Sequence, residues 1–108
     1  MKKKIDYSIP TPKEFTIDYY INKYSAMTFD QVLAESEKDH AYLEKEMSHN
    51  QYHGDAAYRA YNFIRGFRFY SFFSNHTYPA SIDNSYEFAQ IEELFKLIEE
   101  NSNRVDNG

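Results

Sequence analysis

The chain has 108 residues, a formal net charge of −5, no cysteine, and a large aromatic share of 11 tyrosines and 9 phenylalanines. This length suits one domain with a single hydrophobic core. The lack of cysteine excludes disulfides, thiol nucleophiles and cysteine-ligated zinc. The acidic balance disfavours a general nucleic-acid binder, because such proteins gain affinity by neutralising phosphates.

The N-terminus, MKKKIDYSIP, is basic but leads into no apolar run, so it lacks the pattern of a signal peptide. No later stretch is long and apolar enough to cross a membrane. We therefore expect a cytoplasmic protein with a flexible basic N-terminus over residues 1–10, a single helical domain over 11–101, and a disordered polar tail over 102–108.

The first predicted element spans about residues 12–24 and has two interpretations. Thr11 and Glu14 have the spacing of a capping box, and Pro12 lies where the first turn of a helix tolerates proline. Large apolar residues also occupy alternate positions in this segment, as they do in a half-buried strand. The capping box favours a helix, and a strand is the alternative.

The second and fourth predicted helices are amphipathic and acidic. The second spans about residues 28–49 and opens with a capping box between Thr28 and Gln31. The fourth spans about residues 84–101. Six acids and two lysines give the second a net charge of −4, and five acids and one lysine give the fourth the same value. Their charged faces could be solvated surface, or could mimic phosphates toward a protein that handles nucleic acid.

The third predicted helix, over about residues 55–74, contains the stretch YRAYNFIRGFRFYSFF and has one acid and three arginines, a net charge of +2. Its aromatic residues fall almost all the way round a helical projection, which is typical of a helix buried by its neighbours. We expect Arg65 and Arg68 to reach acids on the second and fourth helices. The alternative is that these two arginines bind an anionic ligand or partner. Arg59 and Asn62 lie in the sector with the fewest apolar groups, where they could contact a partner.

These four helices, with few glycines and prolines and short connections, predict an all-α fold that resembles a small four-helix bundle.

No set of catalytic or metal-binding residues is complete. Glu-x-x-His pairs end at His40 and His49, but both pairs lie on the second predicted helix, so they cannot face each other across a bundle core as the di-iron pattern requires. His49, His53 and Asp55 supply at most three ligands, fewer than a closed zinc site needs. We therefore expect no enzymatic activity, no cofactor and no bound metal.

The remaining features favour a non-enzymatic protein–protein interaction module. The tyrosines exceed what one core needs, and exposed tyrosine is common at interfaces. The expected partner is a protein with a basic surface, such as a nucleic-acid-binding protein, and surplus aromatic surface would also suit a homodimer. The expected partner-binding residues are Glu35, Asp39, Tyr42, Glu46, Arg59, Asn62, Glu92 and Glu93.

In size, charge and composition the chain is similar to small acidic proteins of phages and mobile elements that inhibit host defence proteins, such as CRISPR effectors or restriction enzymes. That similarity implies an anti-CRISPR or anti-restriction style of inhibitor. One alternative is a metal-dependent helical enzyme. The other is a helical nucleic-acid-binding protein that uses Lys2, Lys3, Lys4, Arg59, Arg65 and Arg68.

Overall fold

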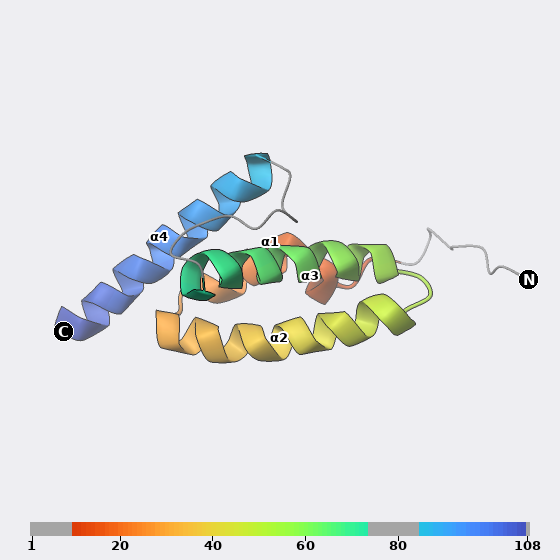
Figure 1. Ribbon diagram of the computed structural model, residues 1–108, viewed down its shortest axis with the longest axis horizontal. Coiled ribbons are helices and arrows are strands. Elements are labelled where there is room, and N and C mark those ends of the chain that lie inside the picture. Colours follow the sequence, from red (N-terminus) through yellow and green to blue (C-terminus); the bar gives the residue numbers. More distant parts are fainter. Residues whose placement is uncertain (1–9, 74–84, 108) are drawn as a thin grey trace, which may run out of the picture.

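The computed structural model describes residues 10–73 and 85–107, and this part of the chain is helical without a strand (Figure 1). In chain order its elements are a 3₁₀ turn η1 (Lys13–Phe15), α1 (Ile17–Tyr24), α2 (Phe29–His49), α3 (Gly54–Arg68), a π-helical turn η2 (Phe69–Phe73) and α4 (Ser85–Asn107). The all-α prediction is confirmed, and the strand alternative for the first segment is wrong. The predicted flexible N-terminus lies, apart from Pro10, outside the described residues.

The first predicted helix is divided into η1 and α1. Thr11 and Glu14 do not form the predicted capping box. Instead Thr16, with an extended backbone at φ −109° and ψ 145°, caps α1 and accepts a hydrogen bond from a first-turn N–H at 3.3 Å. Its hydroxyl also donates to the Lys13 carbonyl at 2.8 Å, which closes η1. The division turns Phe15 into the core, where it is 3% exposed.

α2 begins as its sequence predicts. The Thr28 hydroxyl accepts a hydrogen bond from the Gln31 N–H at 3.4 Å, and the Gln31 side chain accepts one from the Thr28 N–H at 2.9 Å. The predicted capping box is therefore confirmed.

A tight turn joins α2 to α3 and makes the two helices antiparallel neighbours (Figure 1). The Asn50 side-chain oxygen accepts hydrogen bonds from the N–H groups of Tyr52 at 3.0 Å and His53 at 2.7 Å. Gly54 then begins α3, and a Cβ there would lie only 3.2 Å from the Met47 carbonyl oxygen. The absent side chain is what permits this close return of the backbone.

α3 is the central helix and packs mainly along α2. Phe63, Ile64 and Phe67 have no exposed surface, and each such burial stabilises the fold by roughly 1.5–3 kcal/mol. The prediction that this helix is apolar and buried on nearly every side is wrong for one stripe, because Tyr58 is 55% exposed and Arg65 faces solvent. The described core consists of Phe15, Tyr20, Tyr24, Val32, Leu43, Ala57, Ala60, Phe63, Ile64, Phe67, Ile91, Leu94 and Ile98.

α4 continues to Asn107, so residues 102–107 are helical where we predict a disordered tail. The Asn101 side chain donates hydrogen bonds to two carbonyls of the α1–α2 connection, at 2.7 and 3.0 Å. The Ser102 hydroxyl accepts one from the first backbone N–H of α2 at 2.9 Å. These bonds attach the last turns of α4 to the rest of the fold.

α4 runs obliquely to α2 and α3 in Figure 1, so the bundle-like detail of the predicted fold is not confirmed. None of the helices in residues 10–73 and 85–107 is long and apolar enough to span a bilayer.

Candidate interaction surfaces

Two of the predicted partner-binding acids, Glu35 and Asp39, are engaged within the chain. The Asp39 carboxylate accepts hydrogen bonds from the Lys23 ammonium at 2.8 and 3.0 Å and from the Tyr24 hydroxyl at 2.6 Å. The same ammonium lies 3.5 Å from the Glu35 carboxylate. Burial alone lowers the pKa of Lys23, but Asp39 and then Glu35 raise it overall. Asp39 therefore joins α1 to α2 through a charged network.

Two further predicted residues, Tyr42 and Glu46, lie on α2, and Tyr42 contacts η1 at the surface. The Tyr42 ring is 42% exposed, and its centroid lies 6.2 Å from that of Phe15. Partial burial raises the pKa of the Tyr42 hydroxyl, and the nearby groups Glu46, Glu14 and Tyr19 raise it further. We name Glu14, Tyr19, Tyr42 and Glu46 the acidic tyrosine patch.

Local structure explains how this patch is assembled. Tyr42 and Glu46 are four residues apart on α2, so their side chains share one face of the helix. Glu14 belongs to η1, and its carbonyl accepts a hydrogen bond from the Tyr20 hydroxyl at 2.5 Å, which fixes η1 against α1. The patch therefore depends on contacts between three elements.

A surface of opposite charge lies between α2 and the C-terminal end of α3. Its centre is a pocket of about 290 Å³ lined by His40, Arg65, Arg68, Phe69 and Phe73, which we name the cationic pocket. None of the five lining residues is acidic, and the Phe73 side chain is 63% exposed. The pocket thus combines two guanidinium groups with accessible aromatic surface.

Arg68 does not form the predicted pair with an acid of α2 or α4. One terminal nitrogen donates hydrogen bonds to the buried Ser36 hydroxyl at 2.6 Å and to the Leu33 carbonyl at 3.0 Å. The guanidinium carbon also lies 5.5 Å from the centroid of the Phe73 ring. The small Ser36 leaves room for the guanidinium against α2. Arg65 is also without the predicted ion pair among the described residues and points into solvent.

His40 forms the α2 wall of the cationic pocket. Its ring stacks on Tyr61 with centroids 4.4 Å apart and an interplanar angle of 31°. Burial lowers the pKa of His40; the Glu44 charge opposes this shift, and the Arg68 and Arg65 charges add to it, so the pKa is lowered overall. An imidazole with a lowered pKa is neutral at pH 7, so the charge of the pocket comes from the two arginines.

Arg59 and Asn62 lie apart from both surfaces. Arg59 is exposed and lines a cleft of about 690 Å³ between η1, α3 and the start of α4. The same cleft is lined by Asp18 and Glu87, so its charge is mixed. Asn62 is half-buried on α3.

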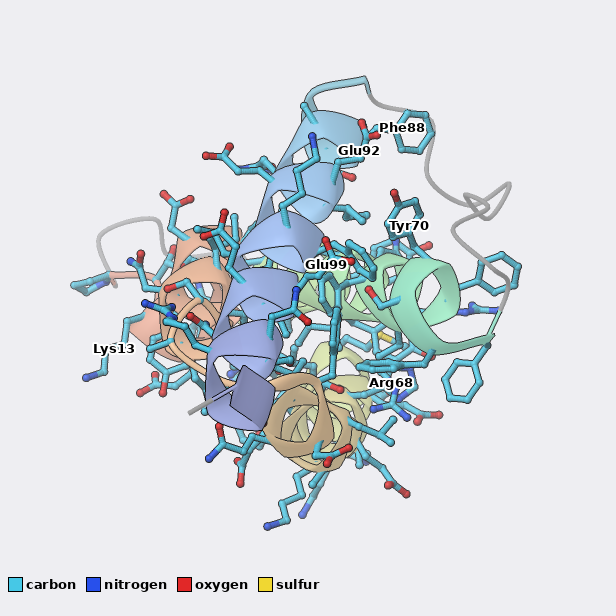
Figure 2. The ribbon with its side chains drawn as sticks, turned by 90° about the vertical axis from the view of Figure 1, so that its left-hand side faces the viewer. Lys13, Arg68, Tyr70, Phe88, Glu92 and Glu99 are labelled. Atoms are coloured by element: carbon cyan, nitrogen blue, oxygen red, sulfur yellow. The ribbon has the colours of Figure 1, made fainter. Side chains whose placement is uncertain are left out.

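Glu92 and Glu93 are exposed on α4. Figure 2 shows Glu92 and Phe88 on the side of α4 that faces Tyr70. Burial and then the Glu92 charge raise the pKa of the Tyr70 hydroxyl. Figure 2 also shows that Tyr70 and Arg68 leave the end of α3 in different directions, Tyr70 toward α4 and Arg68 toward α2.

The histidines do not form a metal site in the described part of the chain. The His49 Nδ1 atom lies 2.8 Å from the Lys45 carbonyl oxygen, and the His53 Nε2 atom is buried without a hydrogen-bond partner. Within residues 10–73 and 85–107, no three His, Asp or Glu side chains are grouped so that they could hold a metal ion.

Comparison of the chain with protein-family models, with curated proteins and with solved structures finds no match. The two surfaces are therefore interpreted from their own geometry and charge.

The sequence predicts Tyr42 and Glu46 as partner-binding residues but does not indicate Glu14. Glu14 joins them only because the helix break at Thr16 places η1 beside α2. For the cationic pocket one signal existed. Arg65 and Arg68 are three residues apart, and aromatic residues follow within one turn. That spacing indicates a shared cationic face and agrees with the alternative that the two arginines bind an anionic ligand, whereas the acidic neighbouring helices favoured internal ion pairs.

Proposed function

We propose that the chain is a non-enzymatic interaction module that binds a protein with a basic surface through the acidic tyrosine patch. The observation that supports this function most directly is the exposed Tyr42 side chain, whose hydroxyl pKa is raised by the charges of Glu14 and Glu46 from two different elements. Tyrosine is favoured at protein interfaces because its rigid ring buries a large apolar area at a small entropic cost.

The acids of the patch define the chemistry of the partner. Neither Glu14 nor Glu46 forms an ion pair within the described ranges, so both can pair with lysine or arginine of a partner. Complementary charge of this kind mainly speeds association and selects the partner. Because the carboxylates lie near the surface, salt should weaken the complex.

The more specific form of this proposal is an inhibitor of the phage or mobile-element type, directed at a defence or nucleic-acid-handling protein. Its support is the small size and the net charge of −5, together with acidic side chains that could occupy a site built for phosphates. Exposed Glu92 and Glu93 on α4 would offer such a partner a further acidic surface.

Affinity purification of the tagged chain from cells of its own source tests the proposal. We expect a recovered protein with a basic surface, and we expect Tyr42→Ala and Glu46→Lys to weaken its binding by about tenfold each. Glu37→Lys is the matched control, because Glu37 is exposed on the same helix but outside the patch.

Two results would contradict the proposal. Equal recovery with all three variants would place the interface elsewhere, and a folded bait that recovers no partner would argue against an interaction module. If sedimentation shows a dimer that the same two substitutions dissociate, the partner is a second copy of the chain.

A further inference from the structure

The cationic pocket brings together two arginines on the surface of an acidic chain. Arg65 and Arg68 both line it, and none of the described residues in its wall is acidic. Within residues 10–73 and 85–107 neither guanidinium forms an ion pair. Two cations on one small surface repel each other unless an anion lies between them.

Arg68 is held in place before any ligand binds. The bonds from one terminal nitrogen to Ser36 and Leu33, and the contact with the Phe73 ring, leave its other N–H groups without a partner among the described residues. Because the side chain is already ordered, less entropy is lost when a carboxylate binds to those N–H groups.

Apolar surface surrounds these cations. Phe73 is 63% exposed, Leu33 is 39% exposed, and Phe69 completes the pocket wall. A volume of about 290 Å³ is just below the range of ligand pockets, which is roughly 300–1,000 Å³. This size suits one or two side chains better than a nucleotide cofactor.

We infer that the cationic pocket binds a single acidic side chain of a partner protein, presented by a segment in which an apolar residue lies beside the acid. The carboxylate binds to Arg65 and Arg68, and the apolar neighbour covers Phe73 and Leu33. His40, whose pKa is lowered, offers the carboxylate a ring nitrogen for a hydrogen bond and adds no positive charge to the pocket.

A peptide fits the surroundings better than a nucleic acid. The rest of α2 carries exposed acids, including Glu37 and Glu44, and the whole chain has a net charge of −5. An extended polyphosphate would meet several of these acids at once, whereas one carboxylate in the pocket meets chiefly Glu44, whose charge also acts on His40. This site is separate from the acidic tyrosine patch and takes a ligand of opposite charge.

Calorimetry with blocked peptides tests the inference. The probe is a short peptide with a central phenylalanine flanked by glutamates, and the matched control peptide has glutamines in their place. We expect the acidic peptide to bind at least about tenfold more tightly than the control peptide. We expect Arg65→Ala and Phe73→Ala each to weaken its binding by about tenfold, and Arg59→Ala to leave it unchanged.

Arg65 and Phe73 are exposed, so their variants should retain the melting curve of the wild type, and Glu46→Lys should not affect peptide binding. The bound carboxylate should also raise the His40 pKa in NMR titrations. Any of three results overturns the inference: the acidic peptide does not bind at millimolar concentration, the glutamine peptide binds with equal affinity, or Arg65→Ala does not change the binding. Tighter, Arg65-dependent binding of a single-stranded oligothymidine also overturns it, in favour of nucleic acid.

Discussion

Asp39 is the residue whose replacement should reveal most about the stability of this fold. Its carboxylate accepts three hydrogen bonds, two from Lys23 and one from Tyr24, and its side chain is 15% exposed. Asp39→Ala removes the acceptor and leaves the Tyr24 hydroxyl buried without a partner, because Tyr24 has no exposed surface.

The magnitude follows from these contacts. Hydrogen bonds to a charged group contribute about 1.5–3 kcal/mol net, and an unsatisfied buried hydroxyl costs about 1–3 kcal/mol. Lys23 is 25% exposed and its ammonium lies 3.5 Å from the Glu35 carboxylate. Glu35 and water therefore partly compensate Lys23 for the loss of its hydrogen bonds to Asp39. We therefore expect Asp39→Ala to lower the free energy of unfolding by about 2–4 kcal/mol, and the melting temperature by roughly 10 °C or more.

Urea unfolding followed by circular dichroism gives the measurement, and Tyr24→Phe supplies the second side of a double-mutant cycle. In the wild type, Tyr24→Phe should cost about 1.5–3 kcal/mol. In the Asp39→Ala background the same substitution should cost nothing or stabilise the fold, because it removes a buried hydroxyl that no longer has an acceptor. Glu37→Ala, on the exposed face of α2, is the control and should change stability by less than about 0.5 kcal/mol. If Asp39→Ala behaved like this control, or if the two substitutions were additive, the network would not stabilise the fold as argued.

Three further predictions concern other polar groups. Arg68→Met should destabilise the fold by about 1–3 kcal/mol in thermal melts, because it removes two hydrogen bonds to α2. Arg65→Met should have almost no effect on stability, and equal effects of the two substitutions would contradict the assigned contacts. Asn101→Ala should cost about 1–2 kcal/mol, and exposed Asn103→Ala should be neutral; a neutral Asn101→Ala would show that α4 is not attached through this side chain. Burial, followed by Asp39, raises the pKa of Tyr24, so the folded state keeps a proton that the unfolded state releases above about pH 10. The free energy of unfolding should therefore keep its full value below that pH and fall above it. In thermal melts at alkaline pH, Tyr24→Phe should reduce this fall.

Local signals predicted the parts of the fold that are determined locally. The capping box of Thr28 and Gln31 begins α2 where expected, since its two hydrogen bonds involve only neighbouring residues. The aromatic distribution of α3 predicted its central position because a mostly apolar helix must be covered.

Competing caps limited the prediction of the first segment. Thr11 and Thr16 both precede helix-forming residues, and their local patterns do not reveal which one caps. The structure has Thr16 as the cap, because this turns Phe15 into the core and places the Tyr20 hydroxyl against the Glu14 carbonyl. Those contacts are tertiary, so the sequence pattern alone could not choose between the two threonines.

The partners of charged side chains were the least predictable part of the candidate sites. Charge balance predicted that Arg68 would pair with a carboxylate, but the packing of α2 on α3 places a serine hydroxyl and a backbone carbonyl within its reach. Conversely, Asp39 was predicted as a surface contact, yet Lys23 and Tyr24 engage it across the α1–α2 boundary. Which charges stay available to a partner therefore depends on helix packing, which the charge pattern does not contain.

α2 separates the two proposed binding surfaces. His40 and Tyr42 are two residues apart, so their side chains diverge by about 200° around the helix axis. One contributes to the cationic pocket against α3, and the other to the acidic tyrosine patch beside η1 and α1. A basic protein and an acidic segment could therefore bind at the same time without contacting each other. Because opposite faces of one helix carry the two surfaces, substitutions on one should leave binding at the other intact, and an interaction module could in this way hold two proteins of opposite surface charge together.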